Sequence, residues 1–387
     1  MSTEPVVASA YSRKNPFPAR LHVNRNLCLE GSEKETRHFE LDLDGSGLIY
    51  ECGDSMGVFP RNDPALVHEI IHALHATGDE IVPGNEGTPK PLVAALTEDY
   101  QITQPSKQFI QHIAERGGET VSLLRDLLSD PLRKQDLEEY LWGLEFIDFL
   151  AGHPSLHFTP EEFVKLLRKL QPRLYSIASS QKAWPTAVHL TIAIVRYESH
   201  GRQRKGVAST FLAERVTETD RVPLFVHVAK GFRMPEDGNT PIIMVGPGTG
   251  VAPFRAYLQD RKATGAKGKN WLFFGEQRCK CDFLYESEFK GYQSDGLLTR
   301  LDVAFSRDQA HKIYVQHKMM ENAAEIWKWI DQEAAHFFVC GDASRMAKDV
   351  DAALLKIVET EGGKTAEEAA LYVEDLKKTK RYKRDVY

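Results

Sequence analysis

Residues 242–261 read IIMVGPGTGVAPFRAYLQDR. The four apolar residues at the start are typical of a buried strand, and the segment after Gly250 has the spacing of a helix. A glycine-rich turn between a strand and a helix lets backbone N–H groups approach a phosphate, where the helix dipole adds positive potential. The turn has neither the GK[ST] of a Walker A loop nor the GxGxxG spacing of the common dinucleotide fold. It indicates either a phosphate site or an ordinary tight turn that requires glycine.

The same alternation of strand and helix continues toward the end of the chain. Short apolar runs are followed each time by a segment in which apolar residues recur every three or four positions. The strands are predicted at 242–245, 271–274, 300–305 and 337–340, and the helices near 253–263, 284–295, 317–332 and 344–360. This pattern predicts an α/β domain over residues 236–387, with a parallel sheet covered by helices on both faces.

The sequence before this domain has two other patterns. Up to about residue 60 the apolar residues alternate, as in HFELDL, where Phe39, Leu41 and Leu43 share one side of a predicted strand. A helical spacing follows, and strand-like runs return in AVHLTIAIVRYES and VPLFVHVAK. We therefore predict a β domain over residues 21–235 with a helical insertion at about 63–170, preceded by a tail or linker at 1–20.

The composition excludes several classes of protein. The chain has 387 residues, of which 42% are hydrophobic and 27% charged, and its net charge is −6. A nucleic-acid-binding protein would usually carry a basic face, and no apolar run approaches the ~18 residues of a membrane-spanning helix. The N-terminus does not resemble a secretory signal, and five scattered cysteines favour a reducing compartment. We expect a cytoplasmic protein that binds neither nucleic acid nor membrane, and the cysteine and histidine spacing predicts no metal site.

Polar residues follow one of the predicted strands of the α/β domain. Ser306 and Arg307 come directly after the strand at 300–305, and the segment KIYVQ begins soon afterwards at Lys312. Ligands bind at the carboxyl ends of strands in an open α/β sheet, and an arginine there can hold a phosphate with two hydrogen bonds. An Arg–Lys pair suits the 2′-phosphate that distinguishes NADP from NAD. The alternative is a solvated charged loop.

The β domain contains a second candidate nucleotide site. The segment 173–176 offers a cation, a ring and a hydroxyl group, and 206–209 is a small-residue turn into a helix. Two such turns could hold two nucleotides, although each one alone is more typical of an ordinary helix start. Cys340, at the end of a predicted strand, either points into the ligand crevice or is a buried, inert thiol. The C-terminal RYKRDVY either frays or stacks its last ring on a planar cofactor.

Taken together, these segments resemble one family. RLYSIASS, GVAST, VGPGTGVAPFRAYLQDR, WLFFGEQ, SRDQ, KIYVQ, VCGD, RMAKDV and RDVY occur in one order, as in the ferredoxin–NADP reductase superfamily. The resemblance is strongest to the diflavin reductases, among them the flavoprotein (alpha) subunits of NADPH–sulfite reductases, and it extends over roughly residues 20–387. It implies an antiparallel FAD-binding barrel with an α-helical connecting insertion, followed by an NADP-binding module.

The resemblance also implies functional residues. It implies FAD contacts at Thr103, Arg173, Leu174, Tyr175, Ser176, Thr191, Ile192, Ala193, Tyr197, Gly206, Val207, Ala208, Ser209 and Tyr387. It implies NADP contacts at Gly248, Thr249, Gly250, Ser306, Arg307, Lys312, Ile313, Tyr314, Val315, Gln316 and Asp349. Ser176, Cys340 and Asp385 are expected to assist hydride transfer, and Tyr387 to cover the flavin until nicotinamide displaces it.

The implied activity is that of an FAD-dependent NADPH reductase that passes electrons to a separate acceptor. The expected acceptor is a sulfite reductase hemoprotein in assimilatory sulfite reduction, reached directly or through flavodoxin or ferredoxin. Full-length relatives begin with a flavodoxin-like FMN domain, for which the roughly twenty residues before the barrel leave no room. We therefore expect FAD and NADPH as cofactors, without FMN or a metal. The alternative is a non-catalytic flavin-binding or docking subunit of a redox complex.

Overall fold

The computed structural model describes residues 9–387, which form two compact units. Unit 1 comprises residues 9–58, 174–194 and 217–387, and unit 2 comprises residues 59–173 and 195–216. The β domain and the parallel sheet both lie in unit 1, and the domain boundary expected near residue 235 stays a prediction. None of the helices in residues 9–387 is long and apolar enough to cross a membrane.

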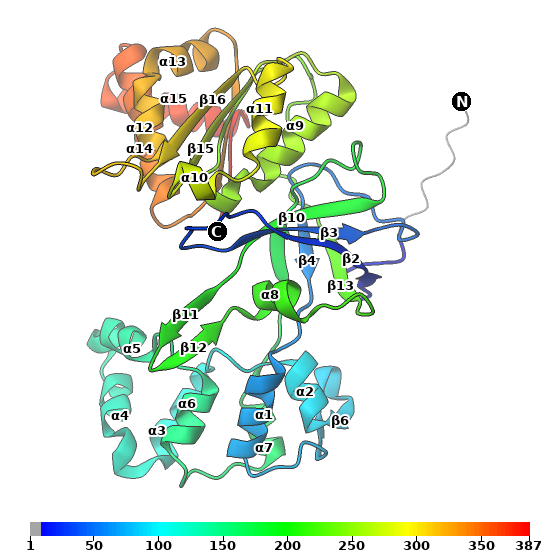
Figure 1. Cartoon of the computed structure of the whole chain (residues 1–387). Helices are drawn as coiled ribbons and strands as arrows, with labels where there is room; N and C mark the ends of the chain where they lie inside the picture. Colours follow the sequence, from blue (N-terminus) through cyan, green and yellow to red (C-terminus); the bar gives the residue numbers. More distant parts are fainter. Residues whose placement is uncertain (1–8) are drawn as a thin grey trace. The chain divides into compact units, whose positions relative to one another are not determined.

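The β domain of unit 1 consists of two antiparallel sheets (Figure 1). One has the order β1-β13-β4-β9 and the other β10-β3-β2, and a bridge between Ile177 and Leu190 links β10 to the chain that follows β9. The strands are β1 (Phe17–Ala19), β2 (Leu21–Asn26), β3 (Thr36–Asp42), β4 (Ser55–Val58), β9 (Arg173–Ser176), β10 (Ala187–Ala193) and β13 (Val222–His227). Strand β1 lies within the segment predicted to be a tail, where Phe17 pairs with Leu224. The first eight residues of that segment lie outside the described residues.

The predicted parallel sheet is present, with five strands in the order β16-β15-β14-β17-β18. The strands are β14 (Ile242–Val245), β15 (Asn270–Glu276), β16 (Arg300–Phe305), β17 (His336–Gly341) and β18 (Tyr382–Val386). The helices are α9 (Ala252–Thr264), α10 (Cys279–Asp282), α11 (Glu286–Ser294), α12 (Val315–Glu321), α13 (Ala323–Asp331), α14 (Met346–Glu361) and α15 (Ala366–Lys378). The helix predicted over 317–332 is divided at Asn322, whose side chain bonds the Lys318 carbonyl and Asp302.

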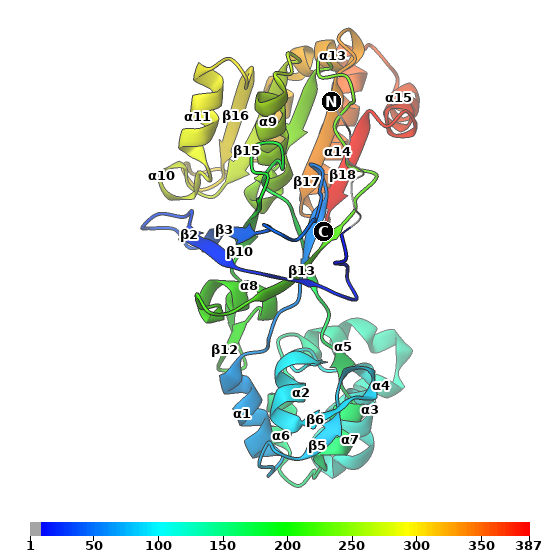
Figure 2. The same cartoon turned by 90° about the vertical axis from the view of Figure 1, so that its right-hand side faces the viewer.

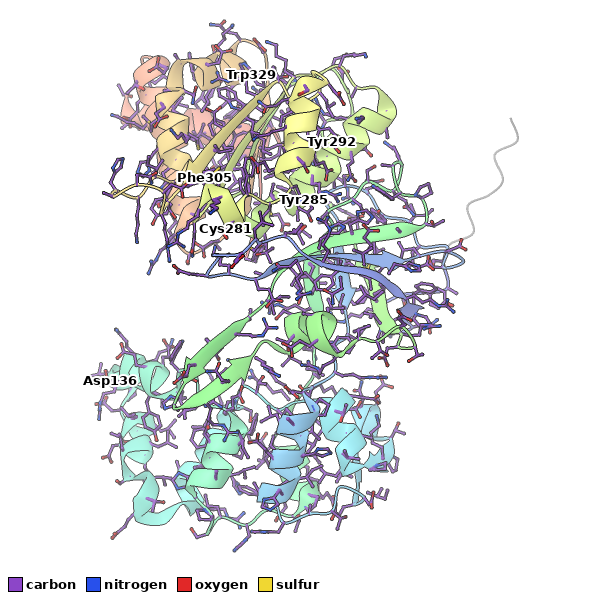
Figure 3. All side chains as sticks on the ribbon, viewed as in Figure 1. Asp136, Cys281, Tyr285, Tyr292, Phe305 and Trp329 are labelled. Carbon is purple, nitrogen blue, oxygen red and sulfur yellow. The ribbon has the colours of Figure 1, made fainter. Side chains whose placement is uncertain are left out.

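Alternate residues of each strand pack on opposite faces of this sheet. Ile243 and Trp271 lie in a cluster with α12 to α15, and Ile242 and Leu272 lie in a cluster with α9 and α11. Trp329 marks the first cluster in Figure 3, and Tyr285, Tyr292 and Phe305 mark the second. Helices therefore cover both faces, as the sequence predicts, and the carboxyl ends of the strands remain available for ligands.

Unit 2 contains the predicted helices. They are α1 (Pro64–Ala73), α2 (Leu92–Glu98), α3 (Lys107–Arg116), α4 (Ser122–Ser129), α5 (Lys134–Leu141), α6 (Phe146–Gly152) and α7 (Pro160–Lys165). Two short strand pairs, β5 (Ile81–Pro83) with β6 (Pro89–Pro91) and β7 (Tyr100–Gln101) with β8 (Arg168–Lys169), lie among them. A hairpin of β11 (Arg196–Ser199) and β12 (Arg202–Lys205) leads into α8 (Val207–Thr210) and a π-helical turn, Phe211–Arg215. Phe109, Phe146 and Phe163 are fully buried at the centre.

A buried arginine fixes the hairpin to this helical core. The Arg204 side chain is 1% exposed and pairs with Glu145 at 3.3 Å and Asp148 at 2.7 Å. Its Nε also donates to Ser199 Oγ at 3.0 Å. Burial raises the pKa of Glu145 to about 7, although Arg204 opposes the shift. The Arg204 guanidinium thus compensates the buried Glu145 carboxyl, and it shares Asp148 with Arg202, which lies 3.7 Å from that carboxylate.

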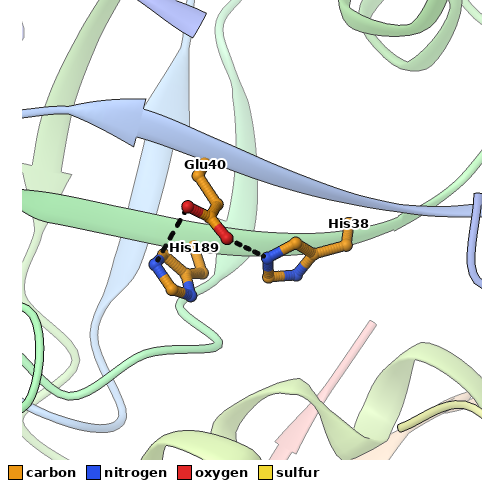
Figure 4. A group of neighbouring side chains, drawn as sticks. All are labelled: His38, Glu40 and His189. Carbon is orange, nitrogen blue, oxygen red and sulfur yellow. Dashed lines mark hydrogen bonds and ion pairs between the residues drawn. The ribbon is translucent and has the colours of Figure 1, made fainter. Parts of the chain in front are cut away.

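A second buried network lies in unit 1, where β3 and β10 meet α9 and α11. Glu40 lies opposite His189 in the β3–β10 register, and its carboxylate lies between His189 and His38 (Figure 4). Arg255 Nη1 lies 3.2 Å from His189 Nδ1. A guanidinium can only donate, so Nδ1 accepts and the neutral ring carries its proton on Nε2, toward Glu40.

The three side chains of this network offer ligand atoms within 4.8 Å of one another, which is close enough for a metal ion. The sequence does not predict this group of possible metal ligands. His38 and His189 are far apart along the chain and come together only because β3 pairs with β10. Arg255 nevertheless places a proton on the nitrogen that a metal would need. His189 Nε2 lies 3.9 Å from Glu40 Oε2, beyond hydrogen-bond distance, and the proton on this nitrogen disfavours a metal ion there.

We predict that Arg204→Gln destabilises unit 2 by about 3–5 kcal/mol, because it removes the ion-pair partner of the buried Glu145 and leaves Asp148 only the longer pair with Arg202. Arg133→Gln is the matched control: the Arg133 side chain is 39% exposed and pairs with the exposed Asp136. Its loss should cost at most about 1 kcal/mol. Hydrogen exchange of the α6 amides measures the loss of stability in each variant. Equal losses of stability in the two variants would contradict the role of Arg204.

We also predict that unit 1 loses stability in acid through His38 and His189. Burial, reinforced by Arg255, lowers the pKa of both rings to about 3, against about 6.5 in an unfolded chain. The unfolded state therefore binds more protons below pH 6.5, and the contribution of each histidine falls by about 2 kcal/mol between pH 7 and 5. The double variant His38→Gln/His189→Gln should show a shallower dependence of unfolding free energy on pH. His22→Gln, an exposed control, should keep the original slope.

Candidate functional site

The three residues expected to assist hydride transfer lie together in unit 1. Cys340 and Asp385 are partners in the register of β17 and β18, which lie side by side in Figure 2. Ser176, at the end of β9, donates its hydroxyl hydrogen to Asp385 Oδ2 at 2.9 Å. The cluster thus joins the β domain to the parallel sheet through residues 209 positions apart in the sequence.

The electrostatics of this cluster differ from residue to residue. Burial raises the pKa of Asp385, while the hydrogen bond from Ser176 opposes the shift. Cys340 is fully buried, and burial together with the nearby Asp385 charge raises the pKa of its thiol well above its ordinary value. Cys340 is therefore a neutral packing group at physiological pH. Asp385 is the group in this cluster able to stabilise a positive charge that develops beside it.

The terminal ring lies at the same edge of the sheet. The backbone of Tyr387 bonds Gly341 and Ala343, each at 3.1 Å, and its hydroxyl lies 3.0 Å from Thr249 Oγ1. The residue is 63% exposed. β18 thus holds the C-terminus against the glycine-rich turn, whereas the sequence left open whether this segment frays.

The glycine-rich turn itself is shaped by close backbone packing. A Cβ on Gly250 would lie 2.1 Å from the carbonyl oxygen of Cys340, so only glycine fits. Gly248 has φ +57°, in the region that favours glycine. The Gly250 N–H donates to the Pro247 carbonyl at 3.1 Å. These contacts show why the turn requires glycine at positions 248 and 250. Contact of these two glycines with a phosphate stays a prediction.

The other expected NADP contacts follow β16 and begin α12. Arg307 pairs with Glu33, and Gln316 Nε2 donates to Asp349 Oδ2 at 3.2 Å. Tyr314 exposes its ring, which stacks on His317 at 6.0 Å. Ser306 and Lys312 lie on the same loop, whereas Val315 is buried in the core and Ile313 packs against it. The set therefore combines a cation, an exposed ring and amide groups at one strand end, which suits an adenosine phosphate.

The expected FAD contacts divide between the two units. Unit 1 contains Leu174, Tyr175, Ser176, Thr191, Ile192, Ala193 and Tyr387. Thr191 is buried with its hydroxyl 2.7 Å from that of Tyr285, and Ile192 is buried in the barrel. Only their backbone groups can reach a cofactor. Leu174, Ala193 and Tyr387 are exposed.

Unit 2 contains the remaining FAD candidates, Thr103, Arg173, Tyr197 and the segment 206–209. Thr103 and Val207 line a cavity of about 180 Å³ whose lining also includes the cations Lys205 and Arg215 and the acids Asp63 and Glu69. Within the turn, a Cβ on Gly206 would lie 2.7 Å from Val195 Cβ, and Ala208 and Ser209 are buried.

The exposed ring of Tyr197 lies 5.8 Å from that of Trp142, at the end of α5. The sequence did not identify Trp142 as a candidate. The positions of the helical insertion and of the β11–β12 hairpin along the chain do not indicate that Trp142 and Tyr197 are in contact. The pair gives unit 2 an exposed aromatic surface.

Comparisons with known proteins match two family models to successive parts of the chain. The model of the FAD binding domain family matches residues 9–211, and that of the oxidoreductase NAD-binding domain family matches residues 244–352. The chain is 48% identical over 380 residues to the sulfite reductase [NADPH] flavoprotein alpha-component of Bacillus subtilis. It is 46% identical over 384 residues to that of Pectobacterium atrosepticum, and 45% over 382 residues to that of Zymomonas mobilis.

These matches cover 98–99% of the chain and 61–62% of each relative. The match to the FAD-binding model alone covers more than half of the chain. The chain therefore belongs to the family of flavoproteins that join this FAD-binding domain to an NAD-binding oxidoreductase domain.

Proposed function

We propose that the chain is an FAD-dependent NADPH reductase that passes electrons to a separate acceptor protein. The observation that supports this most directly is the cluster of Ser176, Cys340 and Asp385 at the carboxyl end of the parallel sheet. It brings a carboxylate and a hydroxyl group from two domains to the edge where Tyr387 presents an exposed ring. The residues fit FAD and NADPH, since exposed rings and cations lie among both sets of candidates.

Bound FAD would supply hydride acceptance from NADPH and the release of electrons one at a time. The residues of the chain would bind and orient both cofactors. Ser176 holds the Asp385 carboxylate by a hydrogen bond, and Asp385 favours positive charge on a nicotinamide beside it. Cys340, as a neutral buried thiol, would pack beside the nicotinamide. Tyr387, exposed at the same edge, would cover the flavin until nicotinamide displaces it, and would therefore act as a gate.

The similar proteins are named alpha-components of a sulfite reductase [NADPH], which implies a further component in those proteins. For this chain we propose a sulfite reductase hemoprotein as the acceptor, reached directly or through a flavodoxin or ferredoxin. The five cysteines are free thiols, which fits a cytoplasmic location.

The test is an anaerobic titration of the FAD-loaded protein with NADPH, followed by addition of each acceptor. We expect the yellow colour to bleach with NADPH and to return when the correct acceptor takes the electrons. A protein that stays colourless and inert after FAD is added would be a docking subunit instead.

We predict that Tyr387→Ala increases the use of NADH. Removing the ring removes a stacking interaction of about 0.5–1.5 kcal/mol that nicotinamide must displace. The kcat/KM for NADH should therefore rise by about two- to tenfold. Tyr387→Phe is the control, because it keeps the ring and removes only the hydroxyl contact with Thr249. If the alanine variant leaves the kcat/KM for NADH unchanged, Tyr387 is not a gate.

A further inference from the structure

A carboxylate bridges two guanidinium groups at the expected NADP site. Glu33, in the loop between β2 and β3, pairs through Oε2 with Arg307 and through Oε1 with Arg278 Nη1 at 3.1 Å. The two arginines follow β16 and β15. Their hydrogen bonds hold the pKa of the Glu33 carboxyl below its usual range, so the group is charged at neutral pH.

The backbone places these two arginines side by side. Beyond the register of β15 and β16, Ser306 N–H donates to the Glu276 carbonyl at 2.9 Å and Arg307 N–H to the Gln277 carbonyl at 2.8 Å. Cys279 N–H donates to Asp308 Oδ2 at 3.0 Å. The two strand ends therefore remain paired beyond the sheet, and the spacing of the arginines does not depend on Glu33.

The loop that carries Glu33 has its own anchors on the NADP-binding domain. Leu29 N–H donates to the Cys281 carbonyl at 2.9 Å, and Ser32 Oγ donates to Asp282 Oδ1 at 2.5 Å. Lys34 Nζ donates to Glu276 Oε2 at 2.9 Å. Glu33 can thus leave the arginines while the loop stays in place.

The chemistry of this bridge matches that of a phosphate site. Guanidinium groups bind carboxylates and phosphates in the same fork geometry, and a phosphate offers more charge and more acceptor oxygens. The side chains of Glu33 and Arg307 are 52% and 40% exposed, so a ligand can reach them. Exposed ion pairs are weak, and a phosphate dianion is able to displace this one.

We propose that Arg278 and Arg307 together bind the 2′-phosphate of NADPH, and that Glu33 occupies this arginine pair in the free protein. The inference rests on the proposed function for the identity of the ligand. Arg278 is then a second phosphate-binding residue beside the expected Arg307. Glu33 is a specificity residue that weakens the binding of NADPH, which must displace it. A nucleotide with a 2′-hydroxyl group in place of the 2′-phosphate binds without displacing Glu33.

The test measures binding of 2′,5′-ADP and 5′-AMP to the FAD-loaded full chain by calorimetry, which requires no turnover. Glu33→Gln should bind 2′,5′-ADP about two- to fivefold more tightly, because the competing exposed ion pair is lost. Arg278→Gln should bind it about tenfold more weakly, because one charge-assisted hydrogen bond to the phosphate is lost. Neither variant should change the affinity for 5′-AMP. Glu35→Gln is the matched control, since Glu35 pairs with Arg37 two residues along the same segment.

Two results would overturn the proposal. One is an unchanged affinity of Glu33→Gln for 2′,5′-ADP, and the other is an equal effect of Arg278→Gln on both nucleotides. Wild-type protein that does not bind 2′,5′-ADP would likewise refute it. If 2′,5′-ADP binds as expected but NADPH does not bleach the flavin, the proposed reductase function fails and the phosphate site stands.

Discussion

The candidate site depends on the parallel pairing of β17 with β18. This pairing sets Asp385 opposite Cys340 and carries the chain on to the Tyr387 backbone bonds with Gly341 and Ala343. A shift of one residue would turn Asp385 away from Ser176, because successive side chains of a strand point to opposite faces. The close approach of Gly250 to the Cys340 carbonyl fixes the glycine-rich turn to the same strand. One strand pair thus positions a carboxylate, a thiol, a terminal ring and a turn.

The fold could be predicted in those segments where apolar residues recur with the period of a strand or of a helix. Phe39, Leu41 and Leu43 alternate and are buried together, and the apolar runs at 242–245 and 300–305 form β14 and β16. β18 was not predicted as a strand, since its charged residues mask the inward Tyr382. The break at Asn322 was missed because it depends on hydrogen bonds to Asp302, on a neighbouring strand.

The candidate site shows the same limit. Arg307 was predicted because an arginine after a strand lies where ligands bind in such sheets. Its partner Glu33 is 274 residues away in the sequence, and only the folded chain brings the two together. The pairing of Glu40 with His38 and His189 likewise follows from the β3–β10 register. Spacing along the chain therefore identifies residues at the ends of elements but not the contacts between distant elements.

The buried Arg204 has a consequence for the construction of chimeric reductases. The β11–β12 hairpin presents Tyr197 and leads into the 206–209 turn, yet its guanidinium is compensated by carboxylates at the start of α6. A hairpin transplanted without that helix would bring the buried Arg204 charge into its new host without Glu145 and Asp148, and the donor would lose the arginines that pair with these acids. The helical insertion and the hairpin can therefore be exchanged between flavoproteins only as one block.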